Sequence, residues 1–507
     1  MRHGVLITIA LGISFDLSSI IGWTHPMIGS MLAGAIAVGI GMVSIRDLRW
    51  GIAAILLELF WGSHGRGLVM QVDGAEFSLR MLIFAAVLLA TCVHLRHARV
   101  RVQILSAFRA HPARWPLAFM IGTVLFAGVV GVFRSPPDQF VRDANAWGFF
   151  LLAPTFILAA LTEQKLTNGR ADSFFIRHSS FAILSGALYL IIRSLVLLFL
   201  FSHDLGGLWV GLYQWVRDTR LGEVTVSVVG FPRVFLPSMV LLFLAALLAA
   251  WMATDRYGWP RIARILAYVV FGGGVAVLVA SLSRSFWLAG AALLALGVVW
   301  RALRALPQFA TIAHGQPASP RSLHMLGGAA IVGVIVVWGV VRIPYPQPLT
   351  TGGLGATLAA RIATDAAVSN RWQQLPPLRA AIAEHAIFGN GFGAAVTYES
   401  KDPRTLAAFP DGRYTTTAFE WGYLDDMLER GFLGLLAELW LIGALIWHGL
   451  RRGGESAVLA LGLLAVAIVH ATSPYLNHPL GIGVVLMAIV KTTHETDGRS
   501  ALPYAAK

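Results

Sequence analysis

The residues best suited to chemistry in this chain are arginines that flank long apolar segments. Arg284 lies in SLSRSFWLAG (281–290), between two apolar segments that are too close together to leave a real loop. Its guanidinium is therefore expected at the outer edge of the hydrocarbon, where a charge needs a partner or water. Two interpretations stand side by side: a group that binds an anion, and a snorkelling arginine that anchors a helix end.

A long polar stretch, residues 343–430, carries several more arginines, including Arg371 and Arg379. Arginine binds phosphate oxygens through two parallel hydrogen bonds, so such a set suits a lipid-linked diphosphate at a membrane surface. The alternative is a solvated segment in which these arginines form ion pairs with the Asp and Glu residues of the same stretch.

The stretch TTTAFEWGYLDDMLERGFLG (415–434) holds the candidate base. Thr417 and Glu420 have the spacing of a capping box, which predicts that a helix starts here. The functional interpretation makes Glu420 a carboxylate at the membrane surface that takes a proton from a sugar hydroxyl. Asp425, Asp426 and His385 are the next candidates for this role.

Two further patterns limit the chemistry. The glycine-rich FGNGFG (388–393) lacks the lysine of a P-loop and follows no predicted strand, so it predicts a tight turn with close backbone approach rather than a nucleotide site. No HExxH motif, DxD pair or Cys/His cluster occurs at ligand spacing. We therefore predict no catalytic metal.

The elements that must position these residues follow from the composition. Of the 507 residues, 57% are hydrophobic and only 13% are charged, against roughly 25% charged residues in average soluble domains. The apolar runs are continuous rather than alternating, which predicts helices instead of a transmembrane barrel. We expect an all-α polytopic integral membrane protein with about 12–14 transmembrane helices. The proposed apolar segments are 4–20, 27–45, 50–62, 78–95, 116–134, 146–162, 178–201, 235–253, 265–282, 286–300, 323–342, 431–449, 456–471 and 478–491.

The lysines and arginines orient these segments. With the N-terminus inside, the inner loops hold 22 of the 39 Lys and Arg residues and the short outer loops hold 8. Because cytoplasmic loops of membrane proteins collect Lys and Arg, both termini are expected in the cytoplasm and residues 343–430 form one long extracytoplasmic loop. The same rule accounts for the net charge of +13, so no nucleic-acid partner is indicated.

A few polar residues lie inside the apolar segments. Intramembrane charges usually face the interior of a helix bundle. Glu58 or Glu438 is therefore a candidate partner for Arg193, and His448 and His470 are the other polar side chains of this kind.

The motifs and the layout resemble the O-antigen ligase and O-antigen polymerase superfamily of bacterial membrane glycan transferases. Three features carry the resemblance: the Ser283-Arg284 pair at the outer end of an apolar segment, the stretch NRWQQLPPLRAAIAEHAIFGNGFG (370–393), and the spacing of Glu420, Trp421, nine residues, Gly431, two residues and Gly434. In the family a histidine occupies the position of Glu420. The resemblance covers residues 235–490.

This resemblance implies transfer of a glycan from an undecaprenyl-diphosphate carrier to the hydroxyl of a lipid or glycan acceptor, on the outer face of the bacterial cytoplasmic membrane. It implies no cofactor and no metal. Arg284 and Arg371 would be the catalytic diphosphate ligands, Arg379 and Arg233 would assist in substrate binding, and Glu420 would be the base. Fixed cations aimed at a developing negative charge stabilise such a transition state.

Ligase and polymerase remain open within this reading, and a transporter or flippase of lipid-linked sugars is the alternative from a different class. The predicted organisation is an N-terminal transmembrane bundle (1–234), an O-antigen ligase-related region (235–490) that includes the outer loop, and a cytoplasmic tail (491–507).

Overall fold

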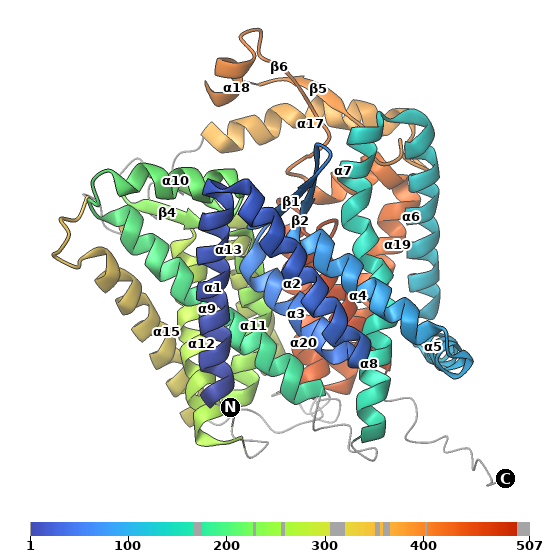
Figure 1. The fold of residues 1–507 in the computed structure, drawn as a ribbon, viewed down its shortest axis with the longest axis horizontal. Coiled ribbons are helices and arrows are strands. Elements are labelled where there is room, and N and C mark those ends of the chain that lie inside the picture. The colour runs from blue at the N-terminus through green and yellow to red at the C-terminus, as the bar shows by residue number, and fades with distance from the viewer. Residues whose placement is uncertain are drawn as a thin grey trace. The chain divides into compact units, whose positions relative to one another are not determined.

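The computed structural model describes residues 2–166, 175–226, 230–254, 259–304, 320–349, 355–357, 366–400 and 403–493. These residues are mostly helical, with three two-stranded antiparallel hairpins (Figure 1). Eight of the described helices are long and apolar enough to cross a membrane, and a bent pair of helices would add a ninth span. The prediction of a helical integral membrane protein is confirmed at this level, whereas the predicted count of about 12–14 spans stays a prediction. Residues 494–507 of the predicted tail lie outside the described residues.

The chain divides into two compact units, each built from separate segments, and these cross the predicted boundary at residue 234. Unit 1 comprises residues 1–94, 172–364 and 453–465. Its elements are α1 (Arg2–Thr24), α2 (Pro26–Arg46), α3 (Leu48–Gly62), β1 (Val69–Val72), β2 (Ala75–Ser78), α4 (Leu79–Leu95), α9 (Phe175–Ser202), α10 (Leu208–Asp218), β3 (Glu223–Val226), β4 (Pro232–Phe235), η2 (Pro237–Val240), α11 (Leu241–Ala253), α12 (Arg261–Ala280), α13 (Arg284–Arg304), α15 (Pro320–Val341) and most of α20 (Gly454–His470).

Unit 2 comprises residues 95–171, 365–452 and 466–507. Its elements are α5 (Ala98–Ala110), α6 (Arg114–Arg134), α7 (Pro137–Trp147), η1 (Gly148–Leu152), α8 (Ala153–Leu166), α17 (Ala366–Glu384), β5 (Val396–Glu399), α18 (Pro403–Ala408), β6 (Arg413–Thr416), α19 (Gly422–Arg452) and α21 (Pro479–Thr493). Helices α6 and α19 pack side by side (Figure 1).

All of the predicted apolar segments fall on helices. Helix α11 consists of apolar residues alone and is buried in unit 1 against α9 and α12. A helix that is hydrophobic all round is typical of a protein core or of a membrane span. The predicted outer loop is largely structured: α17 is followed by the antiparallel pair β5–β6, in which Glu399 lies opposite Arg413. Its last residues, from Gly422, already belong to α19.

His111, in the turn between α5 and α6, gives unit 2 a predicted pH dependence. The ring is 3% exposed; its Nδ1 accepts the Ala113 amide at 3.0 Å, and its Nε2 lies 2.8 Å from the Thr492 hydroxyl. Burial lowers the pKa of His111 from 6.5 to about 4. Below pH 6.5, His111 therefore binds a proton in the unfolded chain but stays neutral in the folded chain. As a result, the free energy of unfolding falls as the pH drops towards 4, by up to about 3 kcal/mol.

The measurement is the melting temperature of the purified protein in detergent between pH 7.5 and pH 5. His111→Gln, which keeps a donor near Nε2 and does not titrate in this range, should lose less stability on acidification than the wild type. Identical pH profiles for the two proteins would mean that His111 takes up its proton as easily in the folded state as in the unfolded state.

Candidate functional site

Arg371 of α17 and Glu420, just before α19, form an ion pair. The two side chains are 34% and 47% exposed, so the pair borders solvent. The indole of Trp421 donates to the Arg371 carbonyl at 3.0 Å, and its ring lies edge-on to Trp372 at 5.5 Å. Two positions that are 49 residues apart in the sequence thus meet at one surface.

An apolar cluster beneath this surface holds the two segments together. It consists of Leu378, Ile382, Val396, Phe419 and Leu428, contributed by α17, β5, the stretch before α19, and α19 itself. Because this cluster fixes α17 against α19, the position of the Arg371–Glu420 pair is set by packing as well as by charge.

The predicted capping box is wrong. Helix α19 begins at Gly422, and the backbone carbonyl of Trp421 accepts the amides of Leu424 and Asp425. Thr417 instead hydrogen-bonds the carboxylate of Asp143. Glu420 precedes the first residue of α19, and its carboxylate pairs with Arg371 instead of capping the helix.

The glycine turn at 388–393 is confirmed as a tight turn with close backbone approach. Gly389, Gly391 and Gly393 all have positive φ, and a Cβ at each would lie within 2.7 Å of a backbone atom of another segment. The amide of Gly391 donates to the Glu429 carbonyl at 2.9 Å, and the amide of Gly393 donates to Asp143 at 2.9 Å. These amides bind protein groups, so the turn joins α17 to α19 and α7 and is not a phosphate cradle.

The remaining predicted arginines lie in both units. In unit 1, Arg284 is the first residue of α13, directly after the turn at 281–283. Arg233 of β4 donates to the Ser281 carbonyl at 3.1 Å in that turn and pairs with Glu223 at 3.1 Å. In unit 2, Arg379 is exposed on α17. The convergence of Arg284 with Arg371 stays a prediction.

A buried charged cluster on α19 was not predicted. Arg430 lies 2.5 Å from Asp426 and also pairs with Glu438, and His470 lies 2.7 Å from the other oxygen of Asp426. All four side chains are at most 3% exposed. The guanidinium also stacks on Trp147 at 4.2 Å. The spacing of Asp426 and Arg430 by one helical turn was the available signal.

The two glycines of the 431–434 pattern shape this cluster. Gly431 has φ 66° and ψ −171° and breaks the helical geometry of α19. A Cβ at Gly434 would lie 2.1 Å from the Cβ of Arg430, so the absent side chain leaves room for the arginine to reach Glu438. The glycine spacing that carries the resemblance therefore has a structural reason in this chain.

Asp426, Glu438 and His470 offer ligand atoms that lie within 4.8 Å of one another, as a metal site would. However, Nδ1 of His470 accepts the backbone amides of Tyr475 and Leu476, both at 3.0 Å, which leaves Nε2 protonated and donating to Asp426. The positive charge among these carboxylates is that of Arg430. The donor set therefore suits an arginine-centred cluster better than a bound metal.

Buried ion pairs in unit 1 correct the predicted partners of Arg193. Arg193 pairs with Asp16 of α1 at 2.9 Å, and Tyr189 also donates to this carboxylate. Glu58 pairs with Arg80 at 2.7 Å. Glu438 pairs with Arg430 in unit 2, so each of the two predicted partners pairs with an arginine other than Arg193.

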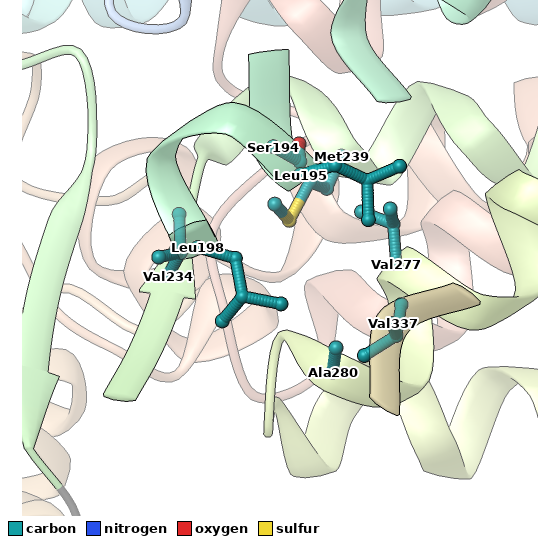
Figure 2. Close-up of a pocket in the computed structure, with 8 residues that line it drawn as sticks. All are labelled: Ser194, Leu195, Leu198, Val234, Met239, Val277, Ala280 and Val337. Atoms are coloured by element: carbon teal, nitrogen blue, oxygen red, sulfur yellow. The ribbon is translucent and has the colours of Figure 1, made fainter. Parts of the chain in front are cut away.

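A cavity in unit 1 is too small to hold a glycan. Its volume is about 10 Å³, and its walls come from α9, β4, η2, α12 and α15 (Figure 2). Apart from Ser194, whose hydroxyl donates to the Leu190 carbonyl, the lining side chains are apolar. A space of this size admits about one water molecule.

Neither a protein-family model nor a curated protein sequence matches this chain.

Proposed function

We propose that this chain is a membrane glycosyltransferase of the O-antigen ligase type, which transfers a glycan from an undecaprenyl-diphosphate carrier to an acceptor hydroxyl at the outer face of the membrane. The observation that carries the proposal is the contact between Arg371 and Glu420. The residue expected to bind the diphosphate and the residue expected to act as base lie against each other at a surface. The substrate class comes from the sequence resemblance.

The pair suggests how donor binding and catalysis are linked. In the resting protein the Glu420 carboxylate is held by Arg371, and a carboxylate next to a guanidinium is a weak base. A diphosphate that takes over the guanidinium frees Glu420. Glu420 then accepts the proton of the acceptor hydroxyl, the acceptor oxygen bonds to the anomeric carbon, and the glycosyl bond to the diphosphate breaks. Arginines stabilise the charge on the departing undecaprenyl diphosphate.

The exposed ring of Trp372, beside Trp421, gives the same surface an apolar face that suits a sugar ring. The remaining roles follow from the resemblance: Arg284 as a second diphosphate ligand, with Arg379 and Arg233 in supporting positions.

A transporter or flippase of lipid-linked sugars is the second candidate. The pair of buried Arg193 with partly buried Asp16 favours it, because charges inside spans often mark a transport path. This guanidinium already has a carboxylate partner, which favours a structural role for the pair.

The experiment that tests the proposal is a glycan profile of cells that lack the protein. Loss of a ligase leaves long lipid-linked glycans on the outer face, loss of a polymerase leaves single lipid-linked units there, and loss of a flippase leaves lipid-linked units on the inner face. Normal surface glycan with no lipid-linked intermediate would contradict the proposal.

The mechanism requires the Arg371–Glu420 pair to face outward. The loops rich in Lys and Arg are expected in the cytoplasm, so Arg413 of β6 is expected on the opposite side of the membrane. A reporter fused after Arg413 should therefore be active only if it is an enzyme that works after export. An alkaline phosphatase fusion and a matched green fluorescent protein fusion make the measurement, with fusions after Arg49 as the inner control. Fluorescence without phosphatase activity at position 413 would overturn both the orientation and the mechanism.

Arg371→Lys should reduce glycan transfer about ten- to a hundredfold, because lysine keeps the charge but loses the paired hydrogen bonds to a diphosphate. Transfer in membranes that contain equal amounts of each variant is the measurement. Arg413→Lys, at an exposed position of the same extramembrane segment, is the matched control. Full transfer by Arg371→Lys would leave Arg371 as the partner of Glu420 alone.

A further inference from the structure

The buried cluster on α19 holds more carboxyl groups than cations. Asp425, Asp426, Glu429 and Glu438 are each at most 4% exposed. Arg430 is the guanidinium that contacts this group among the described residues. If every carboxyl group were ionised, the cluster would carry several uncompensated charges, and each buried unpaired charge costs several kcal/mol.

His470 does not supply the missing positive charge. Its Nδ1 accepts two backbone amides, and its Nε2 faces a carboxylate oxygen of Asp426. A protonated ring would direct its Nδ1 hydrogen at two amide hydrogens. The ring is therefore neutral, with its proton on Nε2.

Asp425 and Glu429 lack direct cation partners in the described part of the chain. Asp425 accepts a hydrogen bond from the Asn477 amide at 2.9 Å through one oxygen. Its other oxygen, and Oε2 of Glu429, are buried without a hydrogen-bond partner among the described residues. The charged groups that act on this pair are Asp426 and Arg430 of α19 and Asp143 of α7.

Asp143 of α7 is a partly exposed carboxyl group that acts electrostatically on this pair. Its side chain is half-buried, accepts the Gly393 amide, and lies within the electrostatic reach of Asp425, of Glu429 and of exposed Arg142. The charges that act on the buried pair therefore include one carboxyl group, that of Asp143, which is partly exposed to solvent.

We propose that Asp425 and Glu429 form a proton-binding site in which each carboxyl group holds a proton at neutral pH, while Asp426 stays ionised between Arg430 and His470. The protons come from the aqueous phase and exchange past Asp143. This site is separate from the proposed transfer chemistry at Arg371 and Glu420, and it holds whether or not that proposal is correct.

Infrared difference spectroscopy of the full-length protein in lipid vesicles tests the proposal directly. At neutral pH the wild type should show carboxylic-acid C=O absorption, which shifts in D₂O and declines when the pH is raised. Asp425→Asn and Glu429→Gln should each remove part of this absorption, and the double variant should remove most of it. Glu420→Gln, which changes an exposed carboxylate, is the matched control and should leave the band unchanged.

Melting temperature gives a second readout. Asn and Gln resemble protonated Asp and Glu, so the variants at 425 and 429 should melt within a few degrees of the wild type, whereas Asp426→Asn should melt much lower. A wild-type spectrum without the acid band at neutral pH would overturn the proposal, as would a band that persists in the double variant. A melting temperature that rises with Na⁺, K⁺ or Mg²⁺ only when Asp425 and Glu429 are present would also overturn it, because the site would then bind a metal cation.

Discussion

Replacing Arg430 by methionine should remove most of the folded protein from the membrane. The guanidinium is buried, contacts Asp426 and Glu438 and stacks on Trp147. Methionine fills much of the volume but leaves two carboxylates without a cation. Breaking a buried ion pair in this way costs about 3–5 kcal/mol, a large part of a total stability of about 5–15 kcal/mol.

The measurement is the amount of protein in purified membranes together with its melting temperature in detergent. Arg451→Met is the matched control, because Arg451 lies exposed at the other end of α19, over the ring of Trp447. It should change stability by no more than about 1 kcal/mol.

A second set of variants separates lost charge from lost volume. Adding Asp426→Asn and Glu438→Gln to Arg430→Met removes the uncompensated charges and should restore much of the stability, since a fully neutral replacement of a buried ion pair is often tolerated. If Arg430→Met alone accumulates and melts like the wild type, the charged cluster does not hold α19 in place.

The positions of the helices could be predicted because the membrane imposes a strong requirement on the sequence. Each span needs a run of apolar residues long enough to cross the hydrocarbon. That requirement identified even α1, whose run is interrupted by Asp16 and which is long and apolar enough to cross a membrane. The segment at 50–62 falls on the helix α3, whose 15 residues are short for a span. The contact of Asp16 with Arg193 explains how the interruption is tolerated.

The partners of the charged residues could not be predicted, because they depend on how helices pack. Arg193 reaches Asp16 across 177 positions of the sequence, and His470 reaches Asp426 across 44. The sequence predicts Arg430 at the end of the outer loop 343–430, where the alternatives were anion binding and a solvated segment with ion pairs. The spacing of Asp426 and Arg430 indicated that these two could pair, but only the packing shows that the pair is buried and that Gly434 leaves space for the arginine side chain.

The candidate site shows the same limit. The sequence placed Arg371 and Glu420 in one extramembrane segment, and the structure brings them into contact. The predicted helix start at Thr417 was wrong. Thr417 hydrogen-bonds Asp143, which lies far away in the sequence, and a four-residue motif carries no information about such a partner. The spacing of residues along the sequence therefore predicted the positions of the helices well, but it predicted the partners of individual side chains poorly.

Glu420→Gln should abolish most glycan transfer while the protein still accumulates in the membrane. Glutamine keeps the shape of glutamate and can still accept a hydrogen bond from Arg371, but it cannot take a proton from an acceptor hydroxyl. Removing a general base typically lowers the rate by about 10²- to 10⁴-fold. Stability should change by no more than about 1 kcal/mol, because the ion pair is 34% and 47% exposed on its two sides.

The measurement is glycan transfer in membranes that contain equal amounts of each variant. Glu399→Gln is the matched control, because Glu399 is an exposed carboxylate on β5 of the same segment and should transfer normally. Normal glycan output from Glu420→Gln would leave Glu420 as the ion-pair partner of Arg371 alone. The base would then be sought at His385, which is exposed directly after α17, since Asp425 and Asp426 are buried in the charged cluster and cannot reach an acceptor at the surface.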